Sequence, residues 1–204
     1  MKLEAHSIGK YFAENLIFKN INFTVHSGES LAITGPNGSG KTTLVRILCR
    51  LISPSEGTVI YEKAGETILT QHIYRYIGLV GPYLELYEEL SAWENLHFFA
   101  NMRNIKDPNS TILRLLERIG LKGREKDQVK NYSSGMRQRL KYAFALLHNP
   151  QILFLDEPTS NLDSEGIKTI YEIMKEQKEN KILIIATNDA SDLKYGDYQI
   201  AVNL

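Results

Sequence analysis

The sequence predicts an α/β protein with a mixed, mainly parallel sheet at its core, antiparallel edge strands and an inserted helical subdomain. Two continuous apolar runs, Ile152–Leu155 and Ile182–Ala186, are typical of strands buried on both faces of a parallel sheet. The first apolar segments alternate more with polar residues and are separated by turn residues, which favours antiparallel pairing. From about Ser91 to Pro150 the chain has little strand character, so this span is expected to be helical.

The apolar segments give the order of the expected elements. Strands are expected around Leu3–Ile8, Ile21–Val25, Leu31–Thr34, Thr58–Tyr61, Tyr76–Val80, Ile152–Leu155 and Ile182–Ala186, with a last one in "GDYQIAVNL". Helical spacing is clear after "DPNS" and after "NLDS", in Ile112, Leu115, Leu116 and Ile119, and in Ile167, Ile170, Tyr171 and Met174. We expect one domain over 1–204, with a core of 1–82 and 151–204 and a helical subdomain of about 83–150.

The composition excludes several classes of protein. Lys plus Arg and Asp plus Glu both total 24, so bulk charge gives no attraction to nucleic acid, and no nucleic-acid partner is expected. Cys49 is the only cysteine, which rules out an intrachain disulfide and favours a reducing compartment. The N-terminal segment has no apolar signal peptide, and no apolar run approaches the roughly 20 residues of a membrane-spanning helix. A role at a membrane would therefore need another chain that spans it.

A glycine-rich loop lies between the apolar residues before Gly35 and the helical pattern that follows it. Gly35, Gly40, Lys41 and Thr42 fill the pattern G-x-x-x-x-G-K-[S/T]. Glycines let successive backbone N–H groups turn toward one anion, and the following helix adds its positive N-terminal end. Lys41 would bring a positive charge to the outer phosphates of a nucleotide, and the Thr42 hydroxyl would ligate the accompanying Mg²⁺. The alternative is a glycine-rich turn that matches the pattern by chance. The expected contacts are Gly35, Pro36, Asn37, Gly38, Ser39, Gly40, Lys41, Thr42 and Thr43.

A second acidic site follows the apolar run "ILFL" in "ILFLDEPTSNLD". Asp156 at the end of a buried strand would hold Mg²⁺ beside the phosphates, usually through water. Glu157 would accept a proton from an attacking water. The alternative is a pair of surface carboxylates that begin a loop.

With these motifs in this order, the chain resembles the ATP-binding subunit of ATP-binding-cassette (ABC) transporters over almost its whole length. "GPNGSGKTT" resembles the Walker A loop, and "ILFLDEP" resembles Walker B, with Glu157 at the catalytic-base position. "SNLD" resembles the D-loop, which adds Asp163 to the expected nucleotide contacts. The resemblance also implies that Tyr11 stacks on adenine; the alternative is a packed tyrosine on an edge strand.

The segment "YSSGM" resembles the ABC signature, whose usual form is Leu-Ser-Gly-Gly-Gln. Ser133 and Gly135 match that form. Ser133 is expected to cap a helix whose N-terminus offers N–H groups and partial positive charge. The resemblance implies that Ser133, Ser134 and Gly135 meet the γ-phosphate held by an opposite subunit, so it implies a dimer with two ATP molecules at its interface.

Two positions depart from the family pattern. Pro82 stands where the family has a glutamine, and Pro82 has neither a side-chain donor nor an N–H. Tyr83 or Glu85 is a candidate substitute. Asn188, after "ILIIAT", stands where the family has a histidine that contacts the γ-phosphate. An amide can donate a hydrogen bond to phosphate, but it neither accepts nor releases a proton near pH 7. The alternative is that Asn188 caps the next turn in "NDASD".

Five aromatic residues cluster in the first part of the helical span: Tyr83, Tyr87, Trp93, Phe98 and Phe99. The resemblance implies a groove here for a short helix of the membrane subunit. The alternative is that these side chains form the subdomain's own core, with Trp93, Phe98 and Phe99 favoured as its members.

The sequence therefore predicts an ATPase subunit of an ABC transporter, with ATP and Mg²⁺ as ligands and Glu157, Asn188 and Lys41 as catalytic residues. Its expected partners are a second ATPase subunit, identical or not, and an integral membrane subunit that holds it on the cytoplasmic face of the cell membrane. The short chain and the phrase "ENLHFF" are similar to the ATPase of the haem exporter used in cytochrome c maturation. Two alternatives stay open: a soluble ATP switch or assembly factor, and a weakly hydrolytic subunit of a heterodimer.

Overall fold

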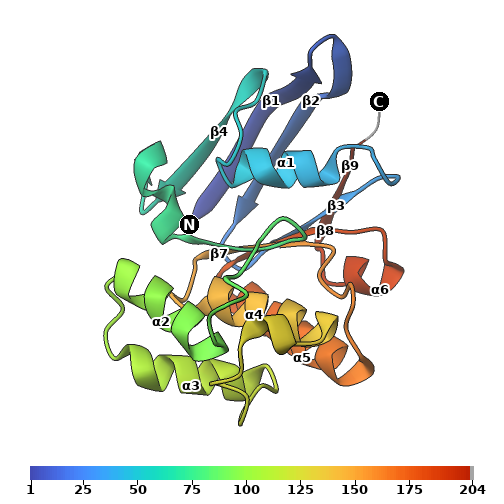
Figure 1. The fold of residues 1–204 in the computed structure, drawn as a ribbon. Helices are drawn as coiled ribbons and strands as arrows, with labels where there is room; N and C mark the ends of the chain where they lie inside the picture. The colour runs from blue at the N-terminus through green and yellow to red at the C-terminus, as the bar shows by residue number, and fades with distance from the viewer. Residues whose placement is uncertain (203–204) are drawn as a thin grey trace.

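The computed structural model describes residues 1–202, which form two sheets and a layer of helices (Figure 1). The strands are β1 (Lys2–Phe12), β2 (Asn15–His26), β3 (Ser30–Thr34), β4 (Glu56–Lys63), β5 (Glu66–Thr67), β6 (Ile77–Val80), β7 (Ile152–Asp156), β8 (Ile182–Ala186) and β9 (Tyr198–Ala201). The helices are α1 (Lys41–Leu48), α2 (Ala92–Met102), α3 (Pro108–Arg118), α4 (Ser134–Leu146), α5 (Ser164–Asn180) and α6 (Ala190–Leu193), with 3₁₀ turns η1 (Thr70–Arg75) and η2 (Val129–Asn131).

The strands form two separate sheets. One has the order β6-β7-β8-β3-β9, and all of its neighbouring strands are parallel. The other has the order β2-β1-β4-β5 and is antiparallel. Every strand predicted from the sequence is present, and the antiparallel strands form a sheet of their own beside the parallel one. The last expected strand appears as β9, and residues 203–204 of that segment lie outside the described residues.

The parallel sheet is buried on both faces, and this explains why β7 and β8 read as unbroken apolar runs. All five residues of each strand are buried. Ile152 and Phe154 belong to the core shared with α1 and the antiparallel sheet, while Leu153 and Leu155 belong to the core shared with the helices. Figure 1 shows α1 between the two sheets and α2 to α5 on the opposite side of the parallel sheet. Alternate side chains of one strand thus fill two different cores.

The expected helical span is confirmed: the residues from 91 to 150 hold α2, α3, η2 and α4, with only an isolated bridge between Ser91 and Gln128. Ser91 and Glu94 form a capping box at the start of α2, and Asp107 caps α3. Trp93 and Phe99 pack against this core, as expected. The expectation that Phe98 belongs to the core was wrong, because Phe98 is 44% exposed. Tyr87 is also exposed, at 54%. Phe99 points inward onto Phe144, and its neighbour Phe98 is therefore carried toward solvent.

The parallel arrangement gathers the ends of β3, β7 and β8 at one edge of the sheet. The residues at or directly after these ends are the predicted glycine-rich loop, the acidic pair and the "TND" segment, so the fold gathers the predicted chemistry at one place. No helix among residues 1–202 has the length and apolar character needed to cross a membrane.

Candidate functional site

The glycine-rich loop between β3 and α1 has a backbone that only glycine accommodates easily. Gly35, Gly38 and Gly40 all have positive φ angles, of 145°, 82° and 103°. A Cβ atom on Gly35 would lie 2.4 Å from the carbonyl oxygen of Val202, and one on Gly40 would lie 2.5 Å from Cγ2 of Ile17. The loop is thus packed between the ends of β9 and β2, and its glycines are required by backbone conformation and by close approach.

The loop leads into α1 with an open helix N-terminus. Gly40 occupies the N-cap position, and no side chain caps the first N–H groups of the helix. The Lys41 ammonium donates hydrogen bonds to the carbonyl oxygens of Gly35 (2.8 Å) and Pro36 (3.2 Å) and is almost fully buried. An adjoining cavity of about 360 Å³ is lined by Asn37, Gly38, Gly40, Lys41, Thr42, Thr43 and Glu157. Free N–H groups and a lysine at a helix N-terminus form a cradle suited to phosphate.

Asp156 is the last residue of β7 and is 1% exposed. Neither of its carboxylate oxygens has a hydrogen-bond partner among the described residues. Burial raises the pKa of Asp156, while the neighbouring Thr42 side chain and the Lys41 ammonium act in the opposite direction. A buried carboxylate without partners beside a hydroxyl fits Mg²⁺, which binds through one or two carboxylates together with substrate phosphates. No group of three or more metal-binding His, Cys, Asp or Glu side chains exists within residues 1–202, so the phosphates would have to supply further ligands.

Glu157 follows immediately and lines the cavity beside the glycine-rich loop. Its backbone has a φ of 52°, which is unusual for a residue with a side chain, and its N–H donates to the Ala186 carbonyl oxygen at 2.8 Å. Burial raises the pKa of Glu157; the Lys41 ammonium lowers it, and the charges of nearby aspartates raise it. A carboxylate with a raised pKa beside a phosphate cradle is suited to accept a proton from water.

Asn188, two residues after the end of β8, also reaches the loop. Its side-chain amide donates a hydrogen bond to Oδ1 of Asn37 at 2.9 Å. The alternative that Asn188 caps the following turn is wrong, because Asp189 is the N-cap of α6 and accepts the Ser191 N–H at 2.7 Å. The structure therefore brings Asn188 together with Asn37 of the predicted phosphate loop.

Asp192 was missed by the sequence analysis. This buried carboxylate accepts hydrogen bonds from the hydroxyls of Thr187 (3.0 Å), Thr159 (3.2 Å) and Tyr171 (3.0 Å). Thr187 precedes Asn188, and Thr159 lies two residues after Glu157, so Asp192 ties together the two segments that carry these side chains. An aspartate in the polar phrase "NDASD" gives no sequence signal of that role, which depends on hydroxyls 5, 21 and 33 positions away in the chain.

The remaining predicted contacts do not reach the loop cavity within one chain. Ser133 caps α4 by accepting the Met136 N–H at 3.2 Å, and Asp163 caps α5 by accepting the Gly166 N–H at 2.8 Å. Tyr11 lies half-buried on β1 and pairs with Leu16 of β2. The next residue of β2, Ile17, lies against Gly40 of the loop. Ser133, Ser134, Gly135, Asp163 and Tyr11 do not line the cavity.

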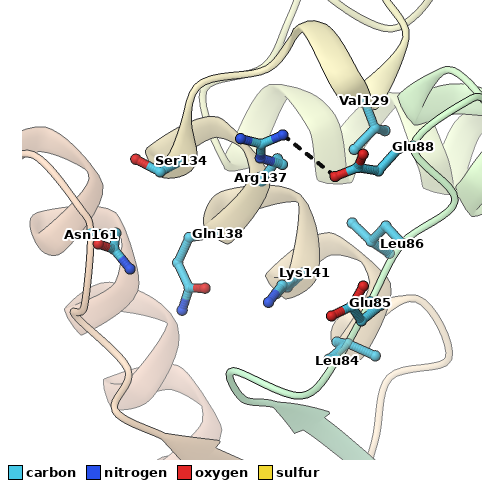
Figure 2. A pocket seen from close by; sticks show the side chains of 10 residues that line it. All are labelled: Leu84, Glu85, Leu86, Glu88, Val129, Ser134, Arg137, Gln138, Lys141 and Asn161. Atoms are coloured by element: carbon cyan, nitrogen blue, oxygen red, sulfur yellow. Dashed lines mark ion pairs between the residues drawn. The ribbon is translucent and has the colours of Figure 1, made fainter.

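Ser134 instead lines a second cavity of about 230 Å³, between the start of α4 and the segment that follows β6. Figure 2 shows Gln138 and Lys141 of α4 directed into the space between Asn161 and the segment from Leu84 to Glu88. Arg137 pairs with Glu88 at 3.6 Å on the rim. Residues of the predicted signature and of the segment that contains Pro82 are thus neighbours, at a cavity separate from the phosphate loop.

Comparison with known proteins shows that this chain is similar in sequence to ATP-binding proteins of ABC transporters. The family model described as "ABC transporter" matches residues 18–160. The uncharacterized ABC transporter ATP-binding protein YdbJ of Bacillus subtilis (strain 168) is 38% identical over 188 residues, which is 91% of this chain and 61% of YdbJ. The lantibiotic transport ATP-binding protein SrtF of Streptococcus pyogenes is 34% identical over 194 residues, 95% of this chain and 82% of SrtF.

Solved structures are similar over nearly the full length of the chain. The post-hydrolysis dimer of the ATP-binding cassette MJ0796 bound to ADP and Pi has a TM-score of 0.87 at 25% identity, and the alignment covers 98% of this chain and 94% of that one. This chain spans less than two thirds of the length of YdbJ, although it spans most of SrtF and of MJ0796.

Proposed function

This chain belongs to the ABC transporter family, and on that premise we propose that it is the ATP-binding and ATP-hydrolysing subunit of an ABC transporter. The observation that carries the proposal is the convergence of Lys41, Thr42, Glu157 and the unpaired Asp156 carboxylate beside the phosphate cradle. We further propose that residues 1–204 act as one ATPase domain, with the core of 1–82 and 151–204 and the helical subdomain of about 83–150.

In the proposed mechanism the loop from Gly35 to Thr43 binds the phosphates through its N–H groups and the Lys41 ammonium. Thr42 and Asp156 would hold Mg²⁺, which when bound neutralises developing charge on the phosphate oxygens. Glu157 accepts the proton of the attacking water, and its raised pKa brings it nearer to the working pH. The Asn188 amide, beside Asn37, donates a hydrogen bond to the γ-phosphate.

We propose that two ATPase subunits close around the nucleotides. The proposal is supported by the separation of Ser133, Ser134 and Gly135 from the loop cavity of their own chain, since they would complete the site only from a second chain. The positive N-terminal end of α4, which Ser133 caps, suits a partner's γ-phosphate. The dimeric structures of MJ0796, a bacterial ABC transporter cassette, support the same arrangement.

We propose that an integral membrane subunit holds the ATPase on the cytoplasmic face of the cell membrane. The exposed aromatic side chains Tyr87 and Phe98 offer apolar anchors, and their rings meet edge to face with centroids 5.8 Å apart. SrtF is named for lantibiotic transport, and another relative, the glutamine transport ATP-binding protein GlnQ of Geobacillus stearothermophilus, is 33% identical over 192 residues, so similar ATPases serve different cargoes. Cargo is therefore assigned to the membrane subunit.

Purification from membranes tests the transport proposal. We expect the tagged chain to co-purify with an integral membrane protein and to hydrolyse ATP only when Mg²⁺ is present. Double substitution of Tyr87 and Phe98 by Ser should reduce recovery of the membrane protein severalfold without changing ATP affinity, because both rings lie away from the loop cavity. Recovery of a purely soluble complex would instead identify an ATP switch or assembly factor.

The proposed contact of Asn188 predicts a kinetic effect. Asn188→Ala should slow single-turnover ATP hydrolysis about 10-fold, the value of one hydrogen bond to a charged group. Rapid-quench measurements of phosphate release would determine the rate. Asn109→Ala removes an exposed amide from α3 and serves as the matched control. Equal rates for Asn188→Ala and the parent would remove Asn188 from the phosphate contacts.

A further inference from the structure

A third cavity, of about 650 Å³, lies where the end of α2 and the first half of α3 meet the residues before β6 and β7. Its lining includes Arg75, Arg103, Arg114 and His148, and none of the described residues that line it is an aspartate or a glutamate. The three arginines come from three elements: the last residue of η1, the C-cap of α2 and the interior of α3. We call this space the arginine cavity. The fold brings together in it three positive charges that are separate in the sequence.

These three charges are not compensated within residues 1–202. None of the three guanidinium groups forms an ion pair with a carboxylate among the described residues. Elsewhere in the helical subdomain Arg118, Arg124 and Arg137 are each paired with a carboxylate. The arginine cavity therefore differs from the rest of this subdomain in holding an excess of positive charge.

Arg103 and His148 show the effect of that excess. Arg103 is half-buried, and its guanidinium donates a hydrogen bond to the Tyr74 carbonyl oxygen at 2.8 Å. Burial lowers the pKa of His148 to about 4, and the charges of Arg103 and Lys181 act in the same direction, so the imidazole is neutral at pH 7. A guanidinium has five N–H donors, so most donors of Arg103 are free to bind a ligand.

The size and lining of the arginine cavity suit a small organic anion. Small-molecule sites in proteins typically have volumes of about 300–1,000 Å³. Guanidinium groups bind phosphate through paired N–H donors, and three of them at one place suit a group that carries two negative charges. Tyr74 and Met102 line the same cavity and are exposed, so they offer apolar surface to the organic part of such a molecule. A phosphate monoester combines these properties.

The arginine cavity is separate from the phosphate loop. Because β6 and β7 are parallel, Arg75 and His148, which precede these strands, lie at the opposite edge of the sheet from Asp156 and Glu157. Figure 1 shows the turn between α2 and α3 on the other side of the molecule from α6 and from the loop that leads into α1. A molecule in the arginine cavity therefore leaves the nucleotide site open.

We propose that the arginine cavity is a second ligand site, which binds a phosphate monoester through the guanidinium groups of Arg75, Arg103 and Arg114. The inference goes beyond the proposed function and does not depend on it. A soluble phosphorylated compound and the headgroup of phosphatidic acid present the same phosphate group, and the experiment distinguishes these two sources.

Calorimetric titration of the full chain with phenyl phosphate tests the soluble form. The nucleotide site is first saturated with AMP-PNP and Mg²⁺, so that the probe does not enter the phosphate loop. We expect saturable binding by the parent and an affinity about 10-fold lower in Arg75→Gln/Arg114→Gln. This double variant removes two exposed side chains and keeps the half-buried Arg103, so its Tm should equal that of the parent. Arg75→Gln alone should lose affinity severalfold and repeats the test with one change.

Arg118→Gln is the matched control, because Arg118 lies one turn after Arg114 on α3 and does not line the arginine cavity. Its affinity for phenyl phosphate should equal that of the parent. Flotation with vesicles of phosphatidylcholine, with and without phosphatidic acid, tests the lipid form. Binding that requires phosphatidic acid and is lost in Arg75→Gln/Arg114→Gln would identify a lipid headgroup as the source of the phosphate.

The outcomes separate this site from the nucleotide site. Equal binding of both probes by the parent and the double variant overturns the proposal, as does the absence of binding to either probe. If neither probe binds and the double variant no longer co-purifies with the membrane protein, the arginines belong to a protein interface instead. Failure of the parent to bind AMP-PNP would overturn the proposed function alone, since the comparison of parent and double variant still measures the arginine cavity.

Discussion

Glu157→Gln should slow single-turnover ATP hydrolysis at least 100-fold while changing ATP affinity less than about threefold. The glutamine amide has nearly the same size as the carboxylate but cannot accept the proton of an attacking water. Glu157 lines the loop cavity beside Lys41, and burial raises its pKa, which makes its carboxylate a better proton acceptor than an unperturbed one. Rapid-quench assays with radiolabelled ATP separate the hydrolysis step from binding.

The same variant should favour the closed dimer. Because hydrolysis opens the proposed dimer, Glu157→Gln with ATP and Mg²⁺ should elute at twice the parent's molecular mass in size-exclusion chromatography with light scattering. Glu172→Gln is the matched control, since Glu172 is exposed on α5 and lines neither cavity. If Glu157→Gln hydrolysed ATP at the parent's rate, Glu157 would not be the base. The proton of the attacking water would then pass to the substrate itself or to another group of the protein.

The parts of the site that could be predicted from sequence are those fixed by local structure. Gly35 and Gly40 are required by the backbone angles of the loop itself, and the loop is followed directly by α1. The runs in β7 and β8 reveal burial on two faces, and the parallel order of the sheet then gathers their ends at one edge. The strand ends were therefore enough to predict that Glu157 lies near the loop, whereas the prediction for Asn188 came from the resemblance to the ABC family.

The parts that could not be predicted depend on contacts between distant residues. Asp192 accepts three hydroxyl bonds from residues 5 to 33 positions away, and no local pattern encodes that set. Tyr83 and Glu85 were equal candidates in the sequence, and only the fold shows that the Tyr83 ring packs back over Gly81 while Glu85 lines the second cavity. Phe98 and Phe99 are chemically identical neighbours, yet the orientation of α2 exposes one and packs the other on Phe144.

Asp156→Asn should reduce the Mg²⁺-dependent gain in ATP affinity about 100-fold. An amide oxygen is a weaker ligand for Mg²⁺ than a carboxylate and leaves the neighbouring phosphate charge less well neutralised. Titration of ATP with Mg²⁺ and with EDTA measures the gain directly. Affinity in EDTA should change little, because the phosphate cradle is built from the loop N–H groups and Lys41.

The same substitution should raise the stability of the nucleotide-free protein by about 1–2 kcal/mol, measured by urea unfolding. Both oxygens of Asp156 are buried without a partner, so the folded protein bears the cost of a desolvated carboxylate that a neutral amide largely avoids. Asp127→Asn, which breaks an exposed ion pair with Arg124, should change stability by less than about 0.5 kcal/mol. A gain in stability together with a loss of Mg²⁺-dependent ATP binding would show that Asp156 serves ligand binding at a cost to the stability of the empty protein. A loss of stability in Asp156→Asn would show that the carboxylate already supports the empty fold.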